Sequence, residues 1–300
     1  MEFKPSNLKA AFWMTGSLTA ILMMAISGRE ASKELNVFQI MEMRSLIGLA
    51  MLYPLIRSSG GVRAMKTGRI WQHLGRNAAH YTGQFAWLQA LSMIPLAQVI
   101  AIEFTTPAWT AVMAVAFLGE RMNLWRTLTI LLGIVGVIII VRPGVGTVDV
   151  GQLIVLGAAF TFGISFTMVK SLTRTESVVK IIFWMLVIQS SIGLLPALHV
   201  WQWPTVHAWP WIVIIAFTGT FSHFCMAKAL LYADATIVIP MDFLRVPLTA
   251  VLGWLIYAER IDIYTALGAA LILSGNLLNL KNKSVPRVPQ TSPAATDQTV

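Results

Sequence analysis

Residues 90–121 of this 300-residue chain occur a second time, without a gap, as residues 229–260. Ten of the 32 aligned pairs are identical, whereas two unrelated apolar helices of this composition would share about three. Each copy carries one acid within an otherwise apolar run, Glu103 in the first and Asp242 in the second. The chain is therefore expected to fold as two related halves, and the matched acids are its first functional candidates.

The repeat lies in a chain with the composition of a membrane protein. Hydrophobic residues make up 56% and charged residues 12%, against about 25% charged in an average soluble domain. The net charge of +9 does not indicate nucleic-acid binding, because Lys and Arg lie mainly between the apolar segments. The single cysteine, Cys225, excludes an internal disulfide.

Ten apolar segments are visible, and they predict an all-α integral membrane protein with ten transmembrane helices. A bilayer core takes roughly 20 apolar residues per helix, so a chain of this length can supply about ten spans. The first segment is expected to be an uncleaved helix rather than a signal peptide. The segments are residues 10–26, 37–56, 71–93, 95–118, 124–141, 151–169, 178–200, 209–232, 235–257 and 262–280.

The segments divide into two repeats. We predict a first repeat over residues 1–141, a linker over 142–150, a second repeat over 151–280 and a disordered polar tail over 281–300. Lys and Arg are more numerous at the N-terminus, in the tail and in the loops after even-numbered segments than in the loops after odd-numbered segments. Because Lys and Arg accumulate on the cytoplasmic side, this predicts that both termini are cytoplasmic. Five helices per half is an odd number, so the halves are expected to cross the membrane in opposite senses. Such inverted repeats are characteristic of secondary transporters, whose substrate site lies near the midplane.

The repeat carries several features of a known family. In each half of the chain the fourth segment contains a proline, an acid–Arg pair follows that segment, and the next segment has a glycine near its end. These residues are Pro107, Glu120, Arg121 and Gly136 in the first half and Pro247, Glu259, Arg260 and Gly275 in the second. The pattern resembles the EamA family of the drug/metabolite transporter superfamily over essentially residues 10–280, and is most similar to bacterial amino-acid exporters of the YddG type. The resemblance implies a bacterial inner-membrane protein, functional as a monomer, that exports small amino acid-like molecules by alternating access.

The two acids are predicted to lie deep in the membrane. Glu103 is eight residues into its segment, or ~12 Å at 1.5 Å per residue, roughly half of a ~30 Å core. Pro107 leaves the carbonyl of Glu103 without its helical donor, and Pro247 does the same for Phe243, so a kink and a hinge are expected beside each acid.

The acids are expected to differ in their partners. Asp242 has Arg245 at i+3, which favours a buried ion pair, although Arg245 is also a candidate for binding a substrate carboxylate. The equivalent position in the first copy is Thr106, so Glu103 has no local partner; Arg44 is one possibility. An unpaired charge at this depth costs at least ~3 kcal/mol, and Glu103 is therefore the proton-coupling candidate.

The third segment offers a polar stripe, formed by His73, Arg76, Asn77, His80, Gln84 and Trp87. His73 and Arg76 are near the cytoplasmic end, where snorkelling to the surface is expected. His80, Gln84 and Trp87 lie deeper, and the 139-residue offset maps the last two onto His223 and Met226. This set either lines a central cavity or forms interhelical hydrogen bonds.

The remaining candidates lie in segments 1, 6 and 10. Gly16, Gly157, Gly163 and Ser165 are small enough for close helix approach. Phe162 and Phe166 face the substrate, the lipid or the protein core. A second stripe of small residues, Ala266, Ala270 and Ser274, is expected to pack against another helix. The predicted substrate-binding set is His80, Gln84, Trp87, Glu103, Phe162, Ser165, His223, Met226, Asp242 and Arg245, with Pro107 and Pro247 as hinges.

Enzyme chemistry is not supported. The chain has no H-E-x-x-H, G-x-S-x-G, P-loop or G-x-G-x-x-G motif, so neither a metal, a cofactor nor ATP is expected. The function predicted is export of amino acids, including hydrophobic and aromatic ones, or of similar metabolites. A proton-coupled multidrug or cation exporter is the alternative, and a nucleotide-sugar or phosphate-ester carrier is a third class.

Overall fold

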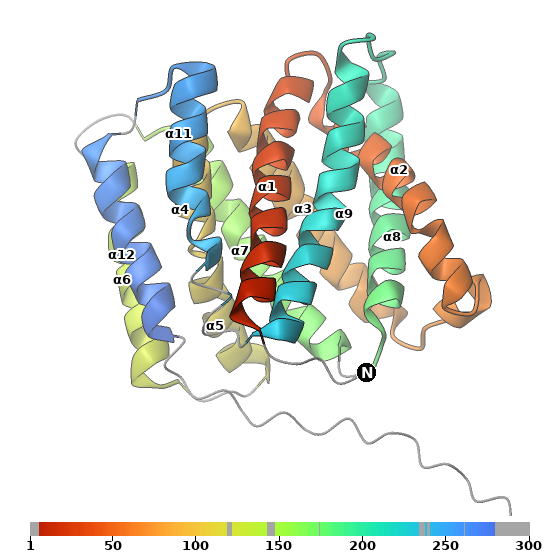
Figure 1. Cartoon of the computed structure of the whole chain (residues 1–300), viewed down its shortest axis with the longest axis horizontal. Helices are drawn as coiled ribbons and strands as arrows, with labels where there is room; N and C mark the ends of the chain where they lie inside the picture. Colours follow the sequence, from red (N-terminus) through yellow and green to blue (C-terminus); the bar gives the residue numbers. More distant parts are fainter. Residues whose placement is uncertain are drawn as a thin grey trace, which may run out of the picture.

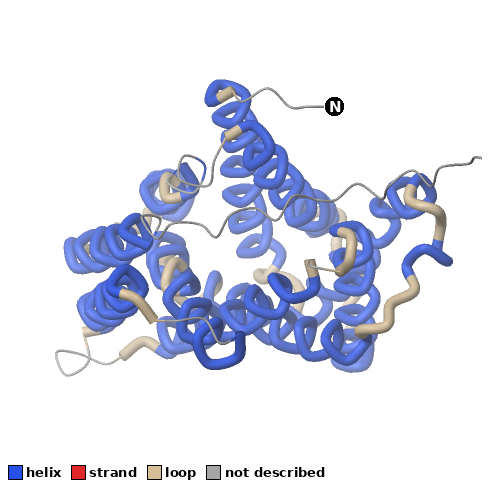
Figure 2. Tube along the Cα trace, turned by 90° about the horizontal axis from the view of Figure 1, so that it is seen from below, coloured by secondary structure: helices blue, strands red, loops and turns tan. Residues whose placement is uncertain are grey.

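The computed structural model describes residues 6–118, 122–142, 148–173, 175–233, 238, 241–260 and 262–279. Within these ranges the chain forms helices, turns and loops, with no strand (Figure 1; Figure 2). The elements are α1 (Asn7–Ala31), α2 (Val37–Ser58), the 3₁₀ helix η1 (Val62–Met65), α3 (Ile70–Leu91), α4 (Leu96–Glu103), α5 (Thr106–Leu118), α6 (Leu124–Val141), α7 (Val150–Leu172), α8 (Val178–His199), α9 (Ala208–Tyr232), α11 (Arg245–Tyr257) and α12 (Ile263–Asn279). The predicted tail, residues 281–300, lies outside the described residues.

The helix starts follow from local sequence. Ser6, Asn36, Asn123, Asp149 and Ser177 each accept a hydrogen bond from a backbone N–H of the following first turn. These side chains satisfy donors that have no partner inside the helix. Polar capping residues between apolar runs thus set where the helices begin.

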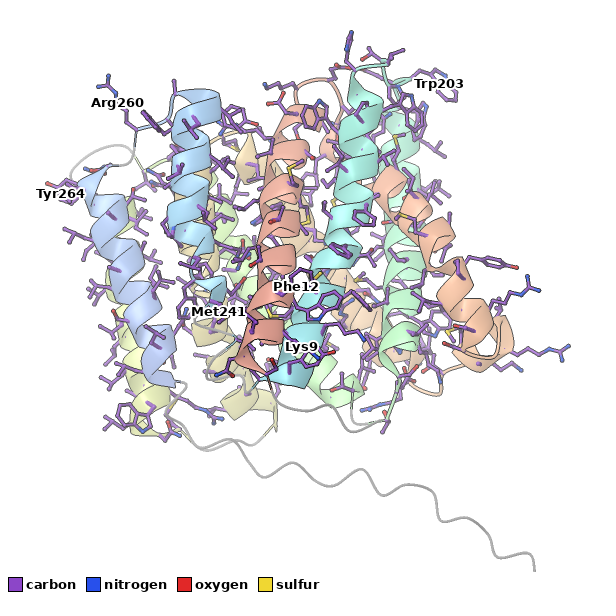
Figure 3. The ribbon with its side chains drawn as sticks, in the orientation of Figure 1. Lys9, Phe12, Trp203, Met241, Arg260 and Tyr264 are labelled. Atoms are coloured by element: carbon purple, nitrogen blue, oxygen red, sulfur yellow. The ribbon has the colours of Figure 1, made fainter. Side chains whose placement is uncertain are left out.

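Six helical stretches are long and apolar enough to cross a membrane, namely residues 7–31, 96–117, 124–141, 150–169, 178–199 and 208–226. Helices α11 and α12 are apolar but shorter, whereas α2 and α3, at 22 residues each, carry several buried polar side chains. Exposed apolar and aromatic side chains, such as Phe12 at 72% and Trp203 at 82%, cover the outer surface. Figure 3 shows Trp203, Arg260 and Tyr264 near one end of the helices and Lys9 toward the other.

The two halves of the chain pack as counterparts. Helix α1 packs on α9, and α7, which stands first in the second half as α1 does in the first, packs on α3. Helix α2 packs on α8 and α6 on α12, so each of these two pairs joins equivalent helices. Helix α4 packs on α11, which is the equivalent of α5. Phe104 and Phe243, equivalent by the 139-residue offset, meet edge to face with ring centroids 5.4 Å apart. Contact between equivalent residues is what a two-fold axis passing through them produces.

The α6–α12 interface shows the same symmetry. A Cβ on Gly136 would lie 2.6 Å from the carbonyl oxygen of Gly268, and one on Gly275 would lie 3.2 Å from the Cα of Thr129. The offset of 139 converts the first contact into the second. Because Gly136 meets Gly268 while the earlier Thr129 meets the later Gly275, the two helices are antiparallel. Equivalent helices that run in opposite directions are the structural sign of an inverted repeat.

One packing prediction is wrong. Ala266, Ala270 and Ser274 are exposed on the outer face of α12. Its packing face instead carries Gly268, Ile272 and Gly275. Small residues occur on both faces of this helix, and only the position of α6 decides which face is covered.

Candidate functional site

Both copies of the repeat contain a break in the helix directly after the acid. Helix α4 ends at Glu103, residues 104–105 form a turn and α5 begins at Thr106. In the second copy residues 243–244 form the equivalent turn and α11 begins at Arg245. Pro107 and Pro247 therefore stand in the first turn of the following helix, where a missing N–H costs no helical hydrogen bond.

The carbonyls released by the first break find side-chain donors. The Thr106 hydroxyl donates to the Glu103 carbonyl at 2.6 Å, and Asn276 Nδ2 of α12 donates to the Phe104 carbonyl at 2.8 Å. Unsatisfied backbone groups are costly in a membrane interior. The break is thus a stable local structure.

Arg245 connects the two breaks. One guanidinium nitrogen lies 3.2 Å from a carboxylate oxygen of Glu103, and the other lies 3.2 Å from Asp242. The guanidinium also stands 4.6 Å from the ring centroid of Phe104. The second oxygen of Glu103 accepts a 2.8 Å hydrogen bond from Trp87 Nε1 of α3. We refer to Glu103, Asp242 and Arg245 as the charged triad.

The prediction that only Asp242 has a charged partner nearby is wrong. Glu103 was expected to lack a local partner, with Arg44 as one possibility, but it pairs with Arg245 and Trp87. The i+3 pair of Asp242 with Arg245 is present as expected. The side chains of Glu103 and Asp242 remain 17% and 14% exposed, so the two carboxylates are partly accessible at the junction of the repeats, whereas Arg245 is buried.

Arg44 belongs to a second polar group, between α2, α3 and α8. It donates to Gln84 at 2.7 Å and to Gln189 at 3.4 Å, and Gln189 in turn is 2.9 Å from His80 Nδ1. Gln84 is one turn from Trp87 on α3, so this group continues into the triad. Gln189 was not among the predicted site residues, although a glutamine within the apolar segment 178–200 was a detectable signal.

The other predicted site residues are placed as follows. Phe162 lies with its ring centroid 5.5 Å from that of His80, beside the polar stripe. The Ser165 hydroxyl is buried without a partner among the described side chains. Met226 packs instead in a separate apolar cluster around Met14 and Ala229. The side chain of His223 lies outside the described part of the structure.

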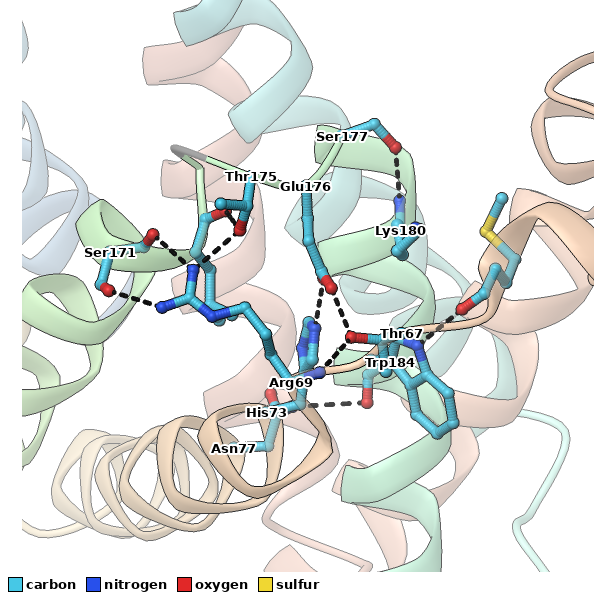
Figure 4. Close-up of polar contacts among 12 residues, drawn as sticks. Thr67, Arg69, His73, Asn77, Ser171, Thr175, Glu176, Ser177, Lys180 and Trp184 are labelled. Carbon is cyan, nitrogen blue, oxygen red and sulfur yellow. Dashed lines mark hydrogen bonds and ion pairs between the residues drawn. The ribbon is translucent and has the colours of Figure 1, made fainter.

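Polar contacts join the halves at one end of α3 (Figure 4). His73 Nε2 is 2.5 Å from Glu176, in the loop between α7 and α8, and the Thr67 hydroxyl also donates to Glu176. Burial by itself raises the pKa of Glu176, but its hydrogen bonds with Thr67 and His73 outweigh burial and lower that pKa below 4.5. The expectation that His73 and Arg76 snorkel is wrong, since both are buried and Arg76 donates to Asn77 at 2.6 Å.

A comparable contact lies at the opposite end of α3. Glu259 pairs with Arg29 of α1 and accepts a 3.0 Å hydrogen bond from the backbone N–H of Leu96, where α4 begins. The Tyr257 hydroxyl donates to Glu30 at 2.8 Å. The equivalent acid–Arg pair of the first repeat, residues 120–121, lies outside the described residues. Each end of the molecule is therefore closed by contacts between the halves.

Comparison with known proteins agrees with this architecture. The model of the EamA-like transporter family matches residues 8–142 and again residues 149–281. A riboflavin transporter of Brucella anthropi is 33% identical over 254 residues, covering 80% of this chain and 86% of that protein. An S-adenosylmethionine uptake transporter of Rickettsia bellii is 24% identical over 265 residues, covering 88% and 91%. A solved structure with 14% identity shares the fold, with a TM-score of 0.64 over 92% of this chain and 99% of the other.

Proposed function

Because the chain belongs to the EamA-like transporter family, and is thus a multi-pass membrane transporter, we propose that its substrate is a flat heteroaromatic metabolite of the riboflavin kind. The relatives at 33% and 24% identity carry riboflavin and S-adenosylmethionine according to their names. Both molecules contain a planar nitrogen heterocycle attached to a chain of polar groups. A site for such a molecule needs an aromatic surface and a few fixed hydrogen-bonding groups.

The observation that carries the proposal is the fixed tryptophan beside the triad. Trp87 is 6% exposed, and its hydrogen bond with Glu103 fixes the orientation of the indole. Phe104 lies with its ring under the Arg245 guanidinium. Aromatic faces so placed favour stacking of a planar ring, while Gln84 and the triad offer donors and acceptors to its polar edge.

Amino-acid export is the second candidate, and the triad also favours it. Arg245 is suited to a substrate carboxylate, and Glu103 with Asp242 to an ammonium group. Both charges of a zwitterion would then be met within one group of residues. A cationic substrate is favoured by the same two acids if Arg245 only balances one of them.

We place the protein in a bacterial inner membrane with both termini in the cytoplasm, ten spans and two inverted halves. The halves would rock about the triad, with the breaks before Pro107 and Pro247 as hinges and the contacts of Glu176 and Glu259 opening in turn. The direction of net transport follows the substrate gradient unless an ion is coupled to it.

Counterflow in proteoliposomes tests the substrate. Vesicles loaded with one unlabelled compound are given the labelled form outside, using riboflavin, S-adenosylmethionine, tryptophan and leucine in turn. We expect rapid exchange of riboflavin and a large loss of that exchange in Trp87→Leu. Trp109→Leu is the matched control, since Trp109 packs edge to face on Phe160 of α7 and, unlike Trp87, has no hydrogen bond with the triad among the described residues. Exchange of tryptophan and leucine without riboflavin would replace the proposal by amino-acid transport.

A further inference from the structure

A third buried acid, Glu42, lies apart from the charged triad. It is on α2, five residues from the helix start, or ~8 Å along the axis, and it is 1% exposed. One carboxyl oxygen accepts a 2.5 Å hydrogen bond from the Ser190 hydroxyl of α8. The other, Oε2, has no hydrogen-bond partner among the described residues.

Near Glu42 Oε2 lies a second buried oxygen without a hydrogen bond in the described part of the chain, Tyr81 Oη. The Tyr81 hydroxyl of α3 is buried and also lacks a hydrogen bond among the described residues. Glu42 Oε2 and Tyr81 Oη each lie 2.9 Å from the point where a Cβ on Gly193 would stand. The two oxygens are therefore gathered around Gly193, and the absence of a side chain there leaves room for both.

From these contacts we propose that Glu42, and not Glu103, is the acid that binds the transported proton, which would make the proposed substrate transport proton-coupled. A buried carboxylate needs donors on both oxygens or a cation nearby. Among the described residues, Glu42 accepts one hydrogen bond and pairs with no cation, whereas Glu103 accepts a hydrogen bond from Trp87 and pairs with Arg245. Asp242 also has one oxygen without a donor, but the other pairs with Arg245.

The side chains around Glu42 can form a hydrogen bond with its carboxyl group in both the protonated and the ionised state. When Glu42 carries the proton, the neutral acid needs no cation, and the Ser190 bond is retained. When the proton leaves, a small rotation of Tyr81 lets its hydroxyl donate to Oε2. Of the titratable and charged groups around Glu42, α3 contributes Tyr81 and His80 and α2 contributes Arg44. Helix α8 faces it with the neutral Ser190 and Gln189. Helix α9 faces Arg44 with Gly219, where an added Cβ would lie 3.8 Å from a guanidinium nitrogen.

A chain of contacts connects this acid to the substrate site. Ser190 is next to Gln189, whose side chain bonds to Arg44 and His80. Arg44 donates to Gln84, one turn before Trp87 on α3. A change of charge at Glu42 therefore acts on Arg44 through a low-dielectric interior, and Arg44 transmits it to the residues proposed to hold the substrate.

Transport in proteoliposomes separates this proposal from the proposed function. We expect wild-type protein to accumulate labelled riboflavin, or whichever compound shows counterflow, when a pH gradient is imposed. Glu42→Gln is expected to keep counterflow without a gradient but to lose the gradient-driven part. Glu103→Gln is the comparison, and is expected to weaken exchange with or without a gradient. Loss of gradient response in Glu103→Gln alone would overturn the assignment, while absence of counterflow for every compound would reject the proposed function instead.

Infrared spectroscopy tests whether Glu42 carries a proton, and it requires no substrate. We expect a carboxylic-acid C=O band at neutral pH that is absent in Glu42→Gln and present in Glu103→Gln. Gly193→Ala places a methyl group against both oxygens and is expected to shift the pH at which that band disappears. Gly48→Ala is the matched control, because its methyl group meets only Leu186 at the same α2–α8 interface. A band unchanged in Glu42→Gln contradicts the proposal, whatever the protein transports.

Discussion

The two helix breaks have the same backbone and different side-chain roles. In each copy an acid ends one helix, a phenylalanine opens the turn and the next helix starts two residues later. Thr110 and Thr249, equivalent and identical, donate to the carbonyls of Thr106 and Arg245 at 2.9 and 2.7 Å. This side-chain hydrogen bond in the first turn after the break is thus present in both copies.

The position that opens the second helix separates the copies. Thr106 turns back to the Glu103 carbonyl, whereas Arg245 reaches across the junction to both acids. A symmetric backbone therefore holds an asymmetric site, in which Arg245 of the second repeat pairs with the acids of both repeats. The repeat gives the two breaks a shared geometry, and the residue at this one position, Thr106 or Arg245, decides which break supplies the cation.

Removal of Arg245 is the strongest test of this difference. Arg245→Ala leaves two acids without a cation, and we expect a loss of about 3–5 kcal/mol in unfolding free energy, measured by thermal unfolding in detergent. Combination with Glu103→Gln and Asp242→Asn should restore much of it. Arg142→Ala is the control, since the Arg142–Asp262 pair is 40% and 30% exposed and is worth about 0–1 kcal/mol. Equal losses in Arg245→Ala and Arg142→Ala would show that the triad is not a buried ion network.

Single neutralisation of the acids ranks their roles. Glu103 bonds to Trp87 and Arg245, while Asp242 bonds to Arg245 alone among the described residues. We expect Glu103→Gln to cost roughly 1.5–3 kcal/mol of stability and Asp242→Asn to cost less. Thermal unfolding of the two variants under one buffer condition measures the difference. A greater loss in Asp242→Asn would mean that Arg245 serves mainly its own repeat.

The glycines of the α6–α12 interface test the symmetry away from the site. A methyl group on Gly136 meets a backbone oxygen at 2.6 Å, whereas one on the equivalent Gly275 meets its nearest atom at 3.1 Å. We expect Gly136→Ala to cost about 1–3 kcal/mol by overpacking and Gly275→Ala to cost less. The expectation of a close helix approach at Gly157 is wrong, since a methyl group there meets no atom of the described residues within 4 Å, and Gly157→Ala is therefore the control. Similar melting temperatures for all three variants would refute the close contact of α6 with α12.

The contact of Glu176 predicts the smallest effect, and it depends on pH. Because the pKa of Glu176 is lowered from 4.5, its contribution to stability is present above pH 4.5 and is lost as the pH falls further, through its lowered pKa. We expect the wild type to lose about 1 kcal/mol more than Glu176→Gln over that range. Unfolding temperatures measured across an acid pH series provide the comparison. Parallel pH curves for the two proteins would show that the ionised carboxylate does not stabilise this end.

Much of the architecture was predictable from the sequence. The apolar segments predicted the helices, and the 139-residue repeat predicted the internal symmetry, because helices and repeats depend on local pattern. The prolines correctly predicted an interruption beside each acid. The six long apolar spans and the family membership confirm a multi-pass membrane transporter, whereas the substrate and the orientation of the termini stay predictions.

The candidate site was predictable only in its members that lie close in sequence. The Asp242–Arg245 pair follows from helical spacing, and the polar face of α3 follows from periodicity. The partner of Glu103 does not, since Arg245 is 142 positions away. Ser190 and Tyr81, which face Glu42, were missed for the same reason.

By itself the sequence determined that this chain is helical, membrane-embedded and doubled, with one acid at the equivalent position of each copy, because each of these properties depends on residues within one segment or on comparison of two segments. Tertiary structure decided that one arginine pairs with both acids and that Glu42 is left with a single donor among the described residues. The reason is geometric: which polar groups meet depends on helices brought together by the internal two-fold, and side chains far apart in sequence become neighbours only there.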